Sequence, residues 1–174
     1  HGRPDFYNLY FLHNIHFLSF AAMMEGRSAL ALEAVHRMES EVPAEFLRNF
    51  PQYADGLMPT RFHVYVRFGR WSELLLQPEF PAFRHISRSV RRYARAIAMA
   101  NQGRTTEARA ELEAFDQEVA AVPETWDIGV NPASVILAIS RQVALGEIQF
   151  KEGRTDAAFK NLGAAQVAED ALIY

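Results

Sequence analysis

The sequence predicts an all-α fold, a solenoid of antiparallel helix hairpins, from two repeated features. Four Gly-Arg dipeptides, which begin at Gly26, Gly69, Gly103 and Gly153, follow one another at intervals of 43, 34 and 50 residues. An alanine follows three of these glycines by five positions, and an apolar residue follows that alanine by four: Ala31 and Val35, Ala108 and Leu112, Ala158 and Leu162. Internal repeats of this length are typical of stacked helix pairs.

Each Gly-Arg pair is predicted to form the turn inside a hairpin, because glycine readily adopts the left-handed conformation that ends a helix. The hydroxyls of Ser28, Thr105 and Thr155 are expected to cap the second helices. The small alanine in each second helix should let the two helices of a hairpin approach closely.

Residues 1–174 are interpreted as one array of four units, about 5–43, 57–80, 84–121 and 132–170. The second unit is degenerate, because Pro78 and Pro81 cut short the helix that begins at Trp71, and Leu74 replaces the alanine. Two insertions, about 44–56 and 122–131, contain Pro and Gly residues that break helices. Both insertions are expected to lie between units.

Composition and charge exclude several classes of function. Lys and Arg total 18 against 21 Asp and Glu, a net charge of −3, which argues against a general binder of nucleic acid or acidic membranes. The sequence has no Cys, Gly-rich phosphate loop, H-E-x-x-H or G-x-S-x-G motif, so we expect no enzymatic activity and no cofactor. The longest apolar stretch, Ile15 to Met24, is too short and too polar to span a membrane. We therefore expect a cytoplasmic protein and, because the chain begins at His1, part of a longer one.

The repeats resemble those of tetratricopeptide-repeat proteins. The 34-residue interval has the tetratricopeptide length, Leu145-Gly146 matches the L-G of the repeat pattern, and Pro43 lies where the pattern expects Pro. The segment Tyr10 to Leu18, followed by Met24-Glu-Gly-Arg27, is similar to a group of long bacterial repeat proteins. This resemblance implies a right-handed superhelix whose concave groove holds a peptide or a partner protein, and it rarely implies catalysis.

One face of each first helix is predicted to line that groove. A helix advances about 100° per residue, so Ile15, Leu18 and Ala22 should pack on the paired helix while the opposite face points inward. Aligning the units on their Gly-Arg pairs gives these inner residues: His13, His16, Phe20, Met24, His63, Arg67, Tyr93, Ile97, Asn101, Val143, Glu147 and Lys151. The predicted function is a non-catalytic scaffold that binds an extended peptide, a partner protein or a small ligand.

Within this groove, Arg67, Asn101 and Lys151 are expected to donate hydrogen bonds to carboxylates or backbone carbonyls. The alternative is an inner face partly filled by its own side chains. A metal site is a further alternative, since His13 and His16 are three residues apart on one helix and His63 could approach from the next unit. The histidine pair could equally make structural hydrogen bonds.

A row of arginines, Arg84, Arg88, Arg91, Arg92 and Arg95, could meet phosphates. We expect instead that carboxylates of the following helix neutralise it: Glu107, Glu111, Glu113, Asp116 and Glu118. No nucleic acid or membrane partner is therefore predicted.

The two ends of the array are expected to contact further protein. Phe6, Tyr7, Tyr10, Phe11 and Phe17 crowd the start, and no later helix follows to cover Leu162, Ala165 and Val167. A solenoid normally ends in a polar cap, so either more repeats follow or two copies form a homodimer. The chain could thus also be a structural or regulatory segment of a larger repeat protein or enzyme.

Overall fold

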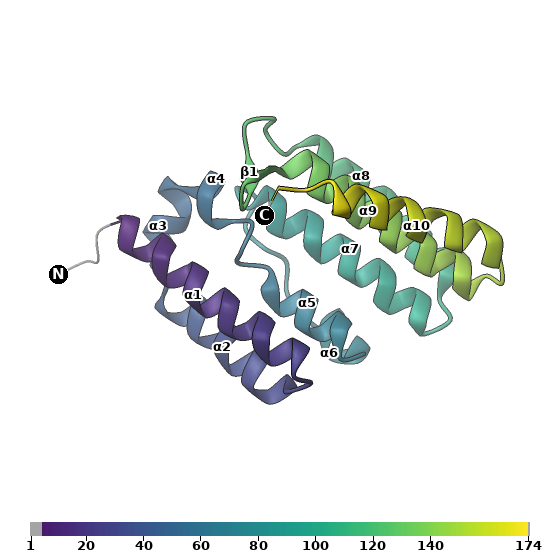
Figure 1. Cartoon of the computed structure of the whole chain (residues 1–174), viewed down its shortest axis with the longest axis horizontal. Helices are drawn as coiled ribbons and strands as arrows, with labels where there is room; N and C mark the ends of the chain where they lie inside the picture. The colour runs from purple at the N-terminus through teal and green to yellow at the C-terminus, as the bar shows by residue number, and fades with distance from the viewer. Residues whose placement is uncertain (1–4, 174) are drawn as a thin grey trace.

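The computed structural model describes residues 5–173 and is predominantly helical, which confirms the all-α prediction (Figure 1). Within this range the elements are α1 (Asp5–Met24), α2 (Ser28–Glu41), α3 (Ala44–Asn49), α4 (Pro51–Ala54), α5 (Thr60–Arg67), α6 (Trp71–Leu75), α7 (His85–Asn101), α8 (Thr105–Ala120), β1 (Asp127–Ile128), β2 (Asn131–Pro132), α9 (Ala133–Lys151) and α10 (Thr155–Asp170). Strands β1 and β2 pair antiparallel, with Ile128 opposite Asn131.

The four Gly-Arg dipeptides that begin at Gly26, Gly69, Gly103 and Gly153 form the same turn between consecutive helices. The glycines have φ values of +74°, +63°, +79° and +77°, in chain order. In each turn the arginine N–H donates to the carbonyl five residues earlier, as Arg27 does to Ala22 at 2.8 Å, and the glycine N–H donates to the carbonyl three residues earlier. This is the Schellman arrangement, which satisfies carbonyls left free at the end of a helix. The degenerate second unit keeps this turn and differs in the length of its second helix.

The expected hydroxyl caps are wrong. Ser28, Thr105 and Thr155 are the first residues of α2, α8 and α10, and no side chain caps these helices. The Schellman turn leads the chain directly from the arginine into the next helix, so the arginine backbone occupies the capping position. Its carbonyl accepts the first helical hydrogen bond, as at Arg104, where the donor is the N–H of Ala108 at 2.9 Å.

Small residues at matching positions bring the helices of a hairpin together. Ala31 and Ala158 are fully buried. Ser19 donates a hydrogen bond to the carbonyl of Ala31 at 3.3 Å, and a Cβ placed on Gly146 would lie 3.2 Å from the carbonyl oxygen of Ala158. The close approach expected from the alanines is thus present in the first and last pairs.

The packing stripe of α1 is shifted from its predicted centre. Ile15 and Ala22 are buried as expected, but Leu18 is 41% exposed. The buried face centres on Ser19, because its small side chain is the one that faces α2. The other face of α1 carries His13, Phe20 and Met24, all exposed.

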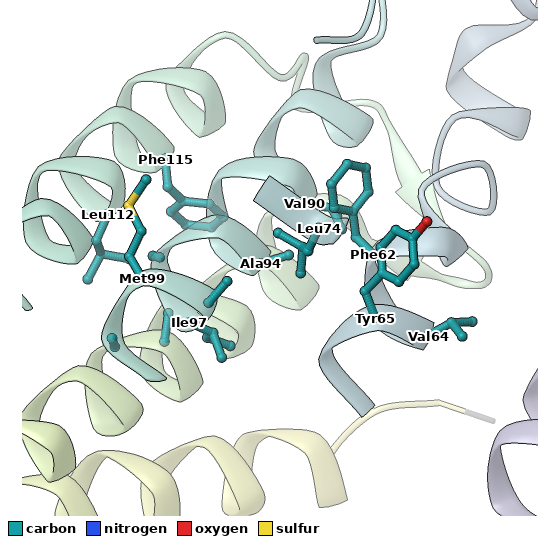
Figure 2. Packing of buried hydrophobic residues seen from close by; sticks show 14 of the residues in the cluster. Phe62, Val64, Tyr65, Leu74, Val90, Ala94, Ile97, Met99, Leu112 and Phe115 are labelled. Atoms are coloured by element: carbon teal, nitrogen blue, oxygen red, sulfur yellow. The ribbon is translucent and has the colours of Figure 1, made fainter. Parts of the chain in front are cut away.

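The helix pairs contact one another in series. Helix α1 packs on α2, α5 on α6, α7 on α8 and α9 on α10; the first helices also contact in the order α1, α5, α7, α9 (Figure 1). The second helices α2, α6 and α8 contact the first helix of the following pair. The main hydrophobic core runs through these contacts; Figure 2 shows its central part, where Phe62 and Leu74 lie near Val90 and Ala94.

The two insertions meet at the start of α7. The carboxylate of Asp55, which follows α4, is buried and accepts hydrogen bonds from the N–H groups of Ile86 and Ser87 at 2.9 and 3.2 Å and from Arg84 Nε at 3.0 Å. An aspartate thirty residues away in sequence therefore satisfies the free N–H groups of this helix. In the second insertion, Ile128 packs on Gly56.

The arginine row of α7 is neutralised, partly by the residues expected. Glu111 and Glu118 of α8 pair with Arg88, Arg92 and Arg95. Glu79 pairs with Arg91, and Asp55 pairs with Arg84; neither carboxylate was in the prediction. The other predicted partners act elsewhere or not at all: Glu107 pairs with Arg104 and Asp116 with Arg141, and Glu113 forms no ion pair within the part of the chain described.

The residues expected to be uncovered at the two ends of the array differ in their exposure. Of the three residues expected to be uncovered in α10, Val167 is 71% exposed, but Ala165 is buried and Leu162 packs on Gly146. At the other end, Tyr7, Tyr10 and Phe17 are exposed, and the side chain of Phe6 lies outside the described residues.

Across residues 5–173, none of the helices combines the length and apolar character that a membrane span needs.

Candidate functional site

Residues of four first helices form a connected line across the molecule. The rings of His63 on α5 and Tyr93 on α7 have centroids 6.4 Å apart. On either side, His16 on α1 interacts electrostatically with His63, and Glu147 on α9 interacts with Tyr93. All four were predicted inner residues. The partners of His63, His16 and Tyr93, are offset by about one helical turn from the residues at its own alignment position.

The protein surroundings shift both His63 and Tyr93 toward their neutral forms. Burial, together with the nearby His16, lowers the pKa of His63 to about 4, and burial, together with Glu147, raises the pKa of Tyr93 to about 12. Yet His63 is exposed and Tyr93 is half-buried. Protein atoms therefore crowd around both groups, although solvent still reaches their side chains. At neutral pH both groups are uncharged.

A pocket of about 260 Å³ opens beside Tyr93 between three helix pairs. It is lined by Val66 of α5, Trp71 of α6, Tyr93, Ile97 and Asn101 of α7, and Val143 and Glu147 of α9. Tyr93, Asn101 and Glu147 belong to the predicted site, and Ile97 and Val143 were also aligned on the inner face. The pocket therefore brings together predicted residues of the last two units only.

The polar groups of this pocket differ in how far the protein itself satisfies them. The amide nitrogen of Asn101 donates to the carbonyl of Ile97 at 3.0 Å. Within residues 5–173, neither a hydrogen bond nor an ion pair engages the carboxylate of Glu147. Lys151 is one turn away on α9, but its ammonium lies 6.0 Å from the ring centre of Phe150. Glu147 is thus a carboxylate available to a ligand.

The remaining predicted site residues do not line this pocket. His13, Phe20 and Met24 lie on the exposed face of α1, where His13 contacts Phe17 with ring centroids 5.5 Å apart. Arg67 and Lys151 are exposed in the last turns of α5 and α9. His63 is linked to the pocket through its contact with the Tyr93 ring, and His16 lies on α1, outside the pocket lining.

Val66 and Trp71 were missed by the sequence analysis. Trp71 begins the second helix of the degenerate unit, and the inner face had been assigned to first helices alone. Its position directly after the Gly69-Arg70 turn is a usable signal, because the ring packs back on that turn, 3.7 Å from where a Cβ of Gly69 would lie.

The three-histidine metal alternative lacks the required geometry. In the part of the chain described, no group of three or more His, Asp or Glu residues is placed to hold a metal ion. Burial and the neighbouring His13 lower the pKa of His16, so both His16 and His63 favour the neutral form. Neither ring is among the residues that line the pocket.

Two other pockets of similar size have different linings. One of about 250 Å³ contains Arg61, whose guanidinium already bonds Glu39 and Gln77. Another, of about 380 Å³, lies between α9 and α10; it is mainly apolar, with Val135 and Ile139 in its wall and the Gln142 side-chain oxygen as a buried acceptor without a partner in the described residues. The pocket beside Tyr93 combines aromatic rings with an unpaired charge, which makes it the candidate site.

Comparisons with protein-family models, curated proteins and solved structures found no match to this chain.

Proposed function

We propose that this protein is a binding scaffold whose inner helices α1, α5, α7 and α9 receive an extended peptide or a segment of a partner protein. The observation that carries this proposal is the pocket of about 260 Å³ whose lining includes Glu147, a carboxylate without a hydrogen bond or ion pair within residues 5–173. A ligand that donates a charge-assisted hydrogen bond to this half-buried carboxylate gains affinity from it.

A tetratricopeptide-like superhelix is part of the same proposal. Its support comes from the four equivalent Gly-Arg turns and from the serial contacts of the first helices. In such an array the first helices line one continuous surface, which an extended chain can follow across several units. The line from His16 through His63 and Tyr93 to Glu147 is such a surface.

Selection of peptides from a random displayed library tests this function. Each selected peptide is measured against the wild-type chain, against Val143→Trp, which fills the pocket, and against Val135→Trp, a matched control in the separate pocket between α9 and α10. We expect peptides that bind the wild type and Val135→Trp but not Val143→Trp. Peptides insensitive to Val143→Trp, or the absence of any selected binder, would contradict the proposal.

A structural or regulatory role through the ends of the array is the second candidate. It is favoured by exposed aromatic residues at both ends: Tyr10 and Phe17 on α1 are 60% and 61% exposed, and Phe159 on α10 is 62% exposed. Large exposed apolar groups on neighbouring turns are a common feature of protein interfaces.

Sedimentation measurements separate this candidate from the first. If the ends form a homodimer, the wild-type chain sediments as a dimer and the double variant Tyr10→Ser, Phe17→Ser as a monomer, while peptide binding at the pocket is unchanged. A wild-type monomer at all concentrations would exclude self-association through these ends.

A further inference from the structure

We propose that the pocket beside Tyr93 binds a positively charged side chain, the guanidinium or ammonium group of an arginine or lysine in the bound segment. This assignment rests on the proposed scaffold function and names the chemistry of its ligand. It differs from the expectation that Arg67 and Lys151 anchor an acidic ligand, because those cations lie outside the pocket lining.

The charge of the pocket determines which ligand it attracts. Glu147 is the one ionisable carboxylate in the lining, and Tyr93 stays neutral at physiological pH because its pKa is raised to about 12. The site therefore carries one negative charge, and no cationic side chain is among its lining residues. A charge-assisted hydrogen bond to the carboxylate is stronger than one between neutral groups.

The aromatic rings supply a second reason to prefer a cation. Trp71 and Tyr93 line the same pocket as Glu147, and a cation over a tryptophan or tyrosine face is attracted by the ring's electron density. The raised pKa of Tyr93 indicates that its surroundings are poorly hydrated, which strengthens such electrostatic attraction.

The size and remaining lining of the pocket suit one side chain. Drug-sized ligands usually occupy pockets of about 300–1,000 Å³, so a pocket of about 260 Å³ is small for them. Val66, Ile97 and Val143 give it apolar walls that can pack against the methylene stem of an arginine or lysine. The oxygen of Asn101 is a further acceptor for an N–H group.

Titrations with four short peptides test the assignment directly. Acetyl-Ala-Ala-Xaa-Ala-Ala-amide, with arginine, lysine, citrulline or glutamate at Xaa, is added to the full chain, and binding is followed by NMR chemical shifts. Citrulline has nearly the shape of arginine without its charge. We expect the arginine or lysine peptide to bind on the order of tenfold more tightly than the citrulline peptide.

Charge-matched variants identify the group responsible. Glu147→Gln should lose that tenfold preference, while Asp156→Asn, the same change of charge at an exposed site in α10, should keep it. Lys151→Gln should leave the preference unchanged or increase it, since it removes a competing cation. If Glu147→Gln is less stable than the wild-type chain, Tyr93→Phe, which retains the aromatic ring, is titrated as the second variant.

The outcomes separate failure of this assignment from failure of the scaffold function. Equal binding of arginine and citrulline peptides, or an arginine preference that survives Glu147→Gln, overturns the cation assignment. Preference for the glutamate peptide that depends on Lys151 overturns it as well, yet keeps the scaffold function. If none of the four peptides binds and library selection also yields none, both proposals fail.

Discussion

The interface between α7 and α8 and the pocket beside Tyr93 use charge in opposite ways. At the interface, Arg88, Arg92 and Arg95 are each bonded to Glu111 or Glu118, with nitrogen–oxygen distances between 2.6 and 3.2 Å. In the pocket, Glu147 belongs to the same array but has no ion pair within residues 5–173. Charges of the first kind hold helices in register, and a charge of the second kind remains free for a ligand.

The contrast is sharpest at Asp55, which is 1% exposed and bonded to Arg84, Ser87 and the backbone of α7. Asp55→Ala should leave the buried Arg84 without its ion-pair partner and two N–H groups of α7 without their acceptor. We expect a loss of about 3–5 kcal/mol in the free energy of unfolding, measured by urea denaturation. A loss below about 1 kcal/mol would show that the bonds of Asp55 stabilise the fold little more than hydrogen bonds to water would.

Steric packing gives the next largest effect. A Cβ on Gly146 would lie 2.7 Å from Cγ of Leu162, so Gly146→Ala should destabilise the α9–α10 pair by about 1–3 kcal/mol. The matched control is Gly163→Ala on α10, where nothing lies within 4 Å of the new Cβ and helix propensity favours alanine by about 1 kcal/mol. Thermal melting of both variants should show shifts of opposite sign; equal shifts would refute this packing explanation.

Replacing one carboxylate in each region by its amide tests whether the two regions use charge differently. Glu111→Gln removes the charge that Arg92 and Arg95 share, and should cost about 1–2 kcal/mol of stability because Glu111 is only 9% exposed. Glu147→Gln removes no ion pair and should change stability by less than about 0.5 kcal/mol. Urea unfolding of both variants checks this; a larger loss from Glu147→Gln would mean that this carboxylate is structural.

The smallest expected effect is the change in stability with pH that arises from His63. Its folded pKa, about 4, lies below the value near 6.5 expected in the unfolded chain, so unfolding takes up a proton between these values. The stability that His63 contributes is therefore present above pH 6.5 and is lost as pH falls toward 4. Compared with His63→Gln, the wild type should show a steeper drop in urea midpoint from pH 7 to pH 5. Parallel pH profiles would contradict the lowered pKa.

Much of the fold could be predicted from the sequence because its main signals are local. A glycine with positive φ followed by arginine fixes each turn through contacts within six residues, which is why all four turns could be located. The capping role of Asp55 could not be predicted in this way, since it acts on α7 thirty residues later and depends on how an insertion folds back. The same reason hid Glu79 as a partner of Arg91.

The helical alignment predicted only the part of the candidate site that lies on long, regular helices. Register on the Gly-Arg pairs correctly grouped Tyr93, Asn101 and Glu147, because α7 and α9 are long and regular. It did not identify Trp71, since α6 is shortened by the prolines that follow and its ring enters the pocket from a second helix. Nor could the alignment show that Lys151 lies over Phe150, because that depends on a side-chain conformation.

Chemical-shift mapping on the ¹⁵N-labelled chain tests the central claim, binding at the inner pocket, most directly. Addition of the arginine peptide should shift the backbone amides around Asn101 and Val143 and the indole N–H of Trp71, with little change at Tyr10 or Phe159. Shifts confined to Tyr10, Phe17 or Phe159, or no shifts at saturating peptide, would contradict it.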